Sequence, residues 1–278
     1  MEKNSIDELV QRVYSIFNQL NAQSELGPND TINPLFSSLV YLALNSDSIT
    51  SKKTARQIQM DGKLQDIINL CCASEIELER YWANRIIEGE NDLTQFPYHG
   101  NYVLLTKFEL EQMQKYMELD GKRLLFVGSG ALPLTAMMFK QQHPSLGIQC
   151  IDKDAEFVRL SRALLSRLGI SYLPISSHDI ASLDSDIQSV LPTSDIVFIA
   201  ALVGKSNLEK NQILSDIQPY LKSGSFAAVR SVPDDLRRLL YPKFELNDAL
   251  RIKYLTLGEY SLPRETGVIN SIVVLSRR

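Results

Sequence analysis

The sequence is poor in the residues that build disulfide frameworks and metal sites. Its 278 residues include only three cysteines and three histidines. Cys71 and Cys72 are adjacent, and Cys150 stands alone. Three cysteines in this arrangement do not form a disulfide framework, and no cysteines and histidines have the spacing of metal ligands. We therefore expect free thiols, no bound metal and a cytoplasmic location.

The sequence also lacks an excess of basic residues and a long apolar run. Its 29 Lys and Arg residues against 33 Asp and Glu give a net charge of −4, which disfavours binding to nucleic acid through its phosphates. No run approaches the roughly 18 apolar residues of a membrane helix, and no signal peptide is visible at the N-terminus. We expect neither a nucleic acid nor a membrane partner. The oligomeric state stays open, with a homodimer as one option.

Two patterns of apolar residues divide the chain. Up to about residue 118, apolar residues recur at helical spacing, which predicts helices over 5–20, 54–87 (interrupted at 61–62) and 104–117, with a loop over 96–102. A further helix over 33–42 would be capped by Asn33 and carry Pro34 in its first turn. From residue 122, short apolar runs alternate with helical segments, notably 155–168 and 208–221. The predicted strands are 124–127, 148–151, 172–175, 196–201, 226–229, 252–257 and 268–275.

This alternation indicates a parallel sheet with helices on both faces. No helix separates the last two predicted strands, which is typical of a hairpin-like pair closing the sheet. We therefore predict an α/β fold with a Rossmann-like sheet of the class I methyltransferase type over 119–278. An N-terminal α-helical domain over 1–118 should cap it.

The turn after the first predicted strand is the best candidate for a nucleotide site. It contains Gly128, Ser129, Gly130, Leu132 and Pro133. The glycines allow a sharp turn and close approach of the backbone to a ligand, and the proline suits the first turn of a helix. The third glycine of pyrophosphate-binding turns is missing. The turn therefore favours a ligand in which a nucleoside is joined to an amino acid. The turn would wrap the amino-acid part.

Further candidates follow other strands, because ligands of such sheets bind at the carboxyl ends of the strands. Asp152 is placed to accept hydrogen bonds from ribose hydroxyls. Asp154 is the second choice, but it could simply cap the next helix. Asp179 could accept from the adenine amino group, with Ile180 packing on the ring, or be an ordinary loop acid. The expected floor of the pocket consists of Ala200, Ala201 and Leu202.

Eight short segments, in order along nearly the whole chain, resemble nicotianamine synthases. The resemblance includes their bacterial relatives that make nicotianamine-like metallophores of the staphylopine and pseudopaline type. Each segment is short, but eight in sequence are specific. They are INPLFSSLV (32–40), CxxExxxE (72–79), FPYHGNY (96–102), GSGALPLT (128–135), AALVG (200–204), VRS (229–231), LLYP (239–242) and VINS (268–271).

The resemblance implies a reaction that folding patterns alone do not show. S-adenosylmethionine would donate its aminobutyrate (3-amino-3-carboxypropyl) arm to the α-amine of an amino acid, and methylthioadenosine would leave. The sulfonium already activates the carbon, so no metal is required. The amine nitrogen, the carbon and the sulfur must lie in line. The amine is mostly protonated near neutral pH, so a base must remove its proton.

The resemblance places a catalytic glutamate in the helix over 54–87 and a tyrosine in the loop that follows. Glu75 is our first candidate for the base and Glu79 the second, since residues four apart share one helix face. Tyr102 is the favoured tyrosine and would orient the amine, whereas Tyr98 would contact the donor. The alternative is that the glutamates form a solvated face paired with arginines of their own helix, and that the tyrosines belong to the core.

Five residues are candidates for the acceptor site. Arg230 could bind a substrate carboxylate through its forked guanidinium, or make a surface ion pair. Asn33 could line the pocket or only cap its helix. The others are His99, Tyr241 and Asn270.

His99 and segment 235–242 depart from the plant pattern, and a plant-like C-terminal extension is missing. We therefore favour one transfer to histidine over the three transfers that give nicotianamine.

Two other classes of function stay open. An ordinary small-molecule methyltransferase would release S-adenosylhomocysteine in place of methylthioadenosine. A non-catalytic binding module would bind the donor without turning over any amino acid.

Overall fold

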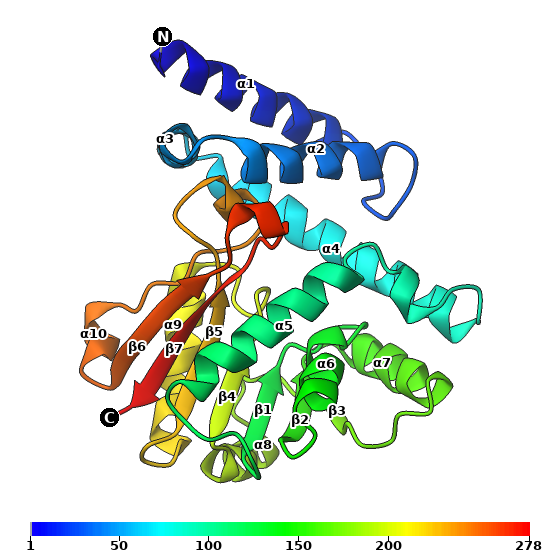
Figure 1. The fold of residues 1–278 in the computed structure, drawn as a ribbon, viewed down its shortest axis with the longest axis vertical. Helices are drawn as coiled ribbons and strands as arrows, with labels where there is room; N and C mark the ends of the chain where they lie inside the picture. The colour runs from blue at the N-terminus through cyan, green and yellow to red at the C-terminus, as the bar shows by residue number, and fades with distance from the viewer. Residues whose placement is uncertain (1) are drawn as a thin grey trace.

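The computed structural model describes residues 2–278, with residues 2–4 described by their backbone alone. Helices α1, α2 and α3 lie at one end of the molecule and the sheet at the other, with α4 and α5 between them (Figure 1). The helices are α1 (Glu2–Asn21), α2 (Ile32–Asn45), α3 (Ser48–Met60), α4 (Leu64–Ile87), α5 (His99–Gln114), α6 (Leu134–Gln142), α7 (Ala155–Arg167), α8 (Ser185–Val190), α9 (Asn207–Ile217) and α10 (Asp248–Arg251). The strands are β1 (Arg123–Val127), β2 (Gly147–Asp152), β3 (Ile175–Ser177), β4 (Ile196–Ile199), β5 (Phe226–Ser231), β6 (Tyr254–Ser261) and β7 (Ser271–Arg277).

The seven strands form one sheet in the order β3-β2-β1-β4-β5-β7-β6. Strands β1 to β5 run parallel, and β7 pairs antiparallel with both β5 and β6. The predicted α/β fold and its closing antiparallel pair are confirmed. Because β2 and β4 lie on opposite sides of β1, the order reverses there, which is where such sheets bind ligands.

The third strand was predicted too early in the sequence. It covers Ile175–Ser177 rather than 172–175. Pro174 has no N–H to donate to the sheet, although its carbonyl oxygen still accepts from the N–H of Cys150 at 2.9 Å. Regular pairing therefore begins after the proline.

Two helix starts also differ from the prediction. Helix α2 begins at Ile32, and the side chain of Asn29, not that of Asn33, accepts from the backbone N–H groups at its start, those of Thr31 and Ile32. Pro34 does lie in the first turn. Helix α5 begins at His99, inside the predicted loop over 96–102. Packing of aromatic rings on Phe96 fixes this turn and overrides its weak helix propensity.

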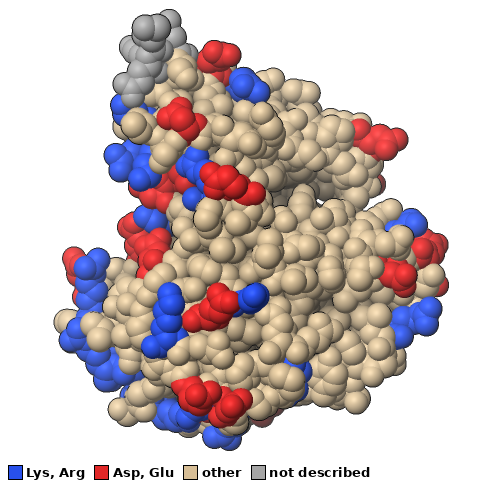
Figure 2. Space-filling view, in the orientation of Figure 1, with Lys and Arg blue, Asp and Glu red and all other residues tan. Residues whose placement is uncertain are grey.

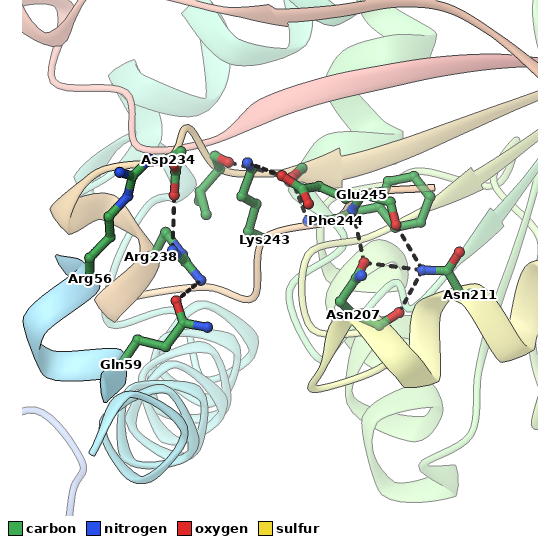
Figure 3. A network of polar contacts seen from close by, with 11 residues as sticks. Arg56, Gln59, Asn207, Asn211, Asp234, Arg238, Lys243, Phe244 and Glu245 are labelled. Carbon is green, nitrogen blue, oxygen red and sulfur yellow. Dashed lines mark hydrogen bonds and ion pairs between the residues drawn. The ribbon is translucent and has the colours of Figure 1, made fainter. Parts of the chain in front are cut away.

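A segment over 232–246, here called the crossover segment, joins the N-terminal helices to the sheet (Figure 3). Its Asp234 pairs with Arg56 of α3, and its Arg238 donates to Gln59 of α3. Its Glu245 is held through its backbone by two asparagines of α9, Asn207 and Asn211. Leucines of the segment (236, 239 and 240) enter the core of the N-terminal helices. The segment therefore fixes the N-terminal helices relative to the sheet.

The predicted boundary between residues 118 and 119 stays a prediction. Apolar side chains on both sides of it share one core, in which Leu110 and Met113 of α5 pack with Phe126 and Phe139. Helix α5 thus packs directly on the sheet domain, whereas α1 to α3 form a separate core with the crossover segment.

The crossover segment generates a prediction about stability. Asp235 is 3% exposed and accepts from the side chains of Arg237 at 2.9 Å and Arg264 at 2.8 Å. The substitution Asp235→Asn leaves buried guanidinium charges without their carboxylate, so the free energy of unfolding should fall by about 3 kcal/mol. Urea denaturation measures it.

Asp248→Asn is the matched control, because Asp248 pairs with Arg251 while its side chain is fully exposed. It should unfold as the parent protein does. Equal midpoints for Asp235→Asn and the parent would contradict the anchoring role of Asp235.

Candidate functional site

Two cavities meet at helix α4. One, of about 490 Å³, lies among the N-terminal helices and the start of α5, and we call it the helical cavity. The other, of about 540 Å³, lies over the carboxyl ends of β1, β2 and β4, and we call it the sheet cavity. Glu75, Glu79 and Tyr102 line both. Figure 2 shows a hollow between the N-terminal helices and the body of the molecule, with mostly uncharged residues around it.

The glycine turn lies in the sheet cavity as predicted. Gly128 and Gly130 have φ values of +83° and +68°, a region that favours glycine. Ser129 and Leu132 also line this cavity, and the hydroxyl of Ser129 is buried without a hydrogen-bond partner. Pro133 is the residue before α6 and does not line the cavity.

The predicted donor-site acids gather in the sheet cavity, but not all of them are free. Asp152 is buried and accepts from the N–H of Gly130 at 2.8 Å and that of Asp154 at 3.0 Å. Asp154 caps α7 by accepting from the N–H groups of Glu156 and Phe157, which matches the alternative considered for it. Asp179 accepts from the N–H of Ala181. The other predicted residues in this cavity are Ile180, Ala200, Ala201 and Leu202.

Glu79 lies against the glycine turn. Its carboxylate accepts from the backbone N–H groups of Ala131 and Leu132, and a Cβ at Gly130 would lie 2.2 Å from its Oε2. Burial and the nearby charges of Glu75 and Asp152 raise the pKa of Glu79 well above its usual range, against these hydrogen bonds. Glu79 therefore connects helix α4 directly to the glycine turn.

Glu75 lies one helical turn before Glu79, at the junction of the cavities. Burial raises its pKa, while a hydrogen bond from the Tyr241 hydroxyl and the charge of Arg230 lower it. Burial and the charge of Glu75 in turn raise the pKa of Tyr241 well above its usual range. Tyr241 therefore stays protonated and donates to Glu75.

The glutamates do not form the solvated face considered as the alternative. Glu77 alone follows that pattern, with Arg80 donating to it at 2.6 Å, and it lines neither cavity. Glu75 and Glu79 point towards the cavities because they lie on the opposite side of α4 from Glu77.

Arg230, predicted to bind a substrate carboxylate through its forked guanidinium, lines the sheet cavity, but one edge of the fork already holds a carboxylate of the protein. Its Nε and one Nη donate to the two carboxylate oxygens of Glu109 at 2.7 and 2.8 Å, and the same Nη donates to Thr135. Arg230 is 5% exposed, so the alternative of an ion pair at the surface is wrong.

The guanidinium of Arg230 lies 5.9 Å from the ring centre of Tyr102. Burial raises the pKa of Tyr102 well above its usual range, and the charges of Glu75 and Glu79 add to this rise.

The helical cavity holds three of the other acceptor candidates, Asn33, Tyr241 and Asn270. The amide nitrogen of Asn270 is buried without a hydrogen-bond partner. Tyr98, predicted to contact the donor, lines this cavity and not the sheet cavity. His99 lines neither, since it opens α5 beside them.

Sequence reasoning missed two buried charged residues, Glu109 and Lys210. Both are 0% exposed. Each occupies the apolar face of its helix, Lys210 three and four positions before Ile213 and Leu214. A charged residue on an apolar face is the signal that could have found them.

No helix among residues 2–278 is long and apolar enough to cross a membrane. Glu118, Asp120 and His143 bring potential metal-ligand atoms within 4.8 Å of one another, but they line neither cavity.

Comparison with known proteins decides the family. A family model described as nicotianamine synthase protein matches residues 1–278. The chain belongs to the nicotianamine synthase family. It is 28% identical to nicotianamine synthase 2 of Oryza sativa subsp. japonica over 282 residues, which cover 98% of this chain and 83% of that one. It is also 28% identical to nicotianamine synthase of Solanum lycopersicum, covering 96% and 82% of the two chains.

Solved structures share the fold. MtNAS in complex with MTA and tNA superimposes with a TM-score of 0.78 at 19% identity, covering 100% of this chain and 98% of that one. A mutant of MtNAS in complex with S-adenosylmethionine gives 0.76 at 19% identity, covering 96% and 97%. The predicted family is confirmed, and with it the enzyme class of S-adenosylmethionine-dependent aminocarboxypropyl transferases.

The contact between Glu79 and the glycine turn generates a prediction about donor binding. In Gly130→Ala the new methyl group meets the Glu79 carboxylate, so the carboxylate must move away from the turn. A lost hydrogen bond to a charged group costs about 1.5–3 kcal/mol, so we expect S-adenosylmethionine affinity to fall by roughly tenfold or more. Isothermal titration calorimetry measures it.

Gly121→Ala is the matched control. Gly121 has φ +69°, but nothing lies within 4 Å of an added Cβ, so this variant carries the backbone strain without the contact. It should bind the donor as the parent does. If both variants bind with parental affinity, the joint role of Glu79 and Gly130 in the donor site is refuted.

Proposed function

We propose that this protein transfers the aminobutyrate arm of S-adenosylmethionine to the α-amine of histidine, forming the precursor of a nicotianamine-like metallophore. The sheet cavity would hold the donor and the helical cavity the acceptor. Glu75 would be the base, Tyr102 would orient the amine, and Glu79 would support the donor turn.

The observation that carries the proposal is the place of Glu75. Its carboxylate lies where the two cavities meet. An amine bound in the helical cavity and a donor carbon bound in the sheet cavity would therefore both lie near it. The amine nitrogen would give its proton to Glu75 and form the N–C bond. The C–S bond would break with its electrons moving to sulfur, and methylthioadenosine would leave as a neutral thioether.

Glu75 suits the role of base better than Glu79. A general base works best when its pKa lies near the working pH, and burial raises the pKa of both glutamates, so their contacts decide between them. Glu79 has its carboxylate engaged by two backbone N–H groups of the donor turn. Its geometry supports a positioning role.

The lining of the helical cavity supports a histidine acceptor. Its charged side chains are those of Asp30, Glu75 and Glu79, and none of the described residues that line it is Lys, Arg or His. Acids together with aromatic rings favour a cationic or aromatic group such as imidazole. The unpartnered amide of Asn270 would then donate to the acceptor carboxylate.

Nicotianamine synthesis by repeated transfers is the second candidate. It is favoured by the whole-chain match to the family and by the nicotianamine synthases among the relatives. Mass spectrometry of products from the purified protein, S-adenosylmethionine and single amino acids distinguishes the two. Our proposal expects methylthioadenosine and one singly modified product from one enantiomer of histidine. A product built from S-adenosylmethionine alone would support nicotianamine instead, and S-adenosylhomocysteine would indicate methyl transfer.

A glutamine at position 75 tests the base directly. Glu75→Gln keeps the size of the side chain but cannot take a proton, so kcat should fall by about 10²- to 10⁴-fold. The dissociation constant of S-adenosylmethionine should change little. Glu77→Gln alters the same helix outside both cavities and should keep parental kcat. Parental turnover in Glu75→Gln would remove this residue from the mechanism.

The hydrogen bond from Tyr241 generates a prediction about pH dependence. The base must be ionised, so kcat is lost as pH falls through the pKa of Glu75. Tyr241→Phe removes a hydrogen bond that lowers this pKa. A hydrogen bond to a charged group is worth about 1.5–3 kcal/mol, so the acidic limb of the kcat profile should move up by roughly one to two pH units. An unmoved limb, or one moved to lower pH, would contradict the assignment.

A further inference from the structure

Lys210 is a fully buried lysine that the proposed reaction does not use. It lies in the first turn of α9 and is 0% exposed. Its Nζ donates to the backbone carbonyl oxygens of Ala200 at 3.1 Å, Ala201 at 3.0 Å and Val203 at 2.7 Å. An ammonium group has three N–H donors, and all three find an acceptor in the same short loop.

This loop, over 200–204, follows β4 and forms part of the lining of the sheet cavity. Its chain wraps closely around the lysine, since a Cβ at Gly204 would lie 3.0 Å from Lys210 Cγ. It also packs against the glycine turn. A Cβ at Gly128 would lie 2.2 Å from a methyl carbon of Val203. The position of the loop therefore sets the width of the cavity beside the glycine turn.

Among the described side chains no carboxylate is hydrogen-bonded to Lys210, and the loop carbonyls are its hydrogen-bond partners. Burial lowers the pKa of Lys210 to about 7, which agrees with an ammonium held by neutral acceptors. A buried cation without a counterion costs free energy. Apolar side chains could pack α9 against the sheet without that cost, so packing alone does not account for a lysine here.

We propose that Lys210 is a positioning residue of the donor site, which holds the loop over 200–204 in the shape that receives the nucleoside part of the donor. This inference rests on the proposed function in that the sheet cavity binds S-adenosylmethionine. It adds a residue with no contact to the acceptor, so its loss should act on donor binding and leave acceptor binding nearly unchanged.

The test compares Lys210→Met and Lys210→Gln, because methionine removes all three donors and glutamine keeps two. We expect the dissociation constants of S-adenosylmethionine and methylthioadenosine, measured by calorimetry, to rise at least tenfold in Lys210→Met and by less in Lys210→Gln. The KM of the acceptor at saturating donor should stay within about twofold of the parental value. Lys222→Met is the control, since Lys222 pairs with Asp195 outside both cavities.

If Lys210→Met does not fold, the comparison is made with Lys210→Gln alone. A folded variant of either kind with parental affinity for both ligands would overturn the proposal, as would equal losses for donor and acceptor. These outcomes are separate from a failure of the proposed function, in which the parental protein itself would not bind S-adenosylmethionine.

Discussion

The structure depends on shielding one half-buried carboxylate partly from water. Glu75 lies where the helical cavity meets the sheet cavity, and burial raises its pKa. A carboxylate in water is too weak a base to take a proton from an amine efficiently. Burial moves its pKa towards that of the amine, while the hydrogen bond from Tyr241 and the charge of Arg230 lower it. These opposing effects on its pKa make Glu75 suitable as a base.

Much of the surrounding structure holds this point in place. Helix α4 carries Glu75 and is fixed to the donor turn through Glu79. The crossover segment links α3 to the sheet (Figure 3). It also contains Tyr241, whose hydroxyl acts on Glu75. The pair of Glu109 and Arg230 lies beneath Tyr102. The same contacts that join the N-terminal helices to the sheet therefore also build the site.

The sequence was most informative where local rules decide the structure. The glycine turn, the cap at Asp154 and the closing antiparallel strands follow from backbone geometry and periodicity. It was least informative where a side chain's partner comes from far along the chain. Arg230 was assigned to a substrate because nothing local shows that Glu109, 121 positions away, occupies its guanidinium. The placement of Tyr98 and the role of Lys210 depend on tertiary packing in the same way.

The most direct test is an infrared titration of Glu75, taken as the difference between the parent protein and Glu75→Gln. The account predicts that the carboxylic acid band of Glu75 disappears at a pH above the usual glutamate pKa of about 4.3. It also predicts that this titration coincides with the acidic limb of the kcat profile. A Glu75 carboxyl group that ionises at its ordinary pKa would contradict the account, because the carboxylate would then not be shielded from water where the cavities meet.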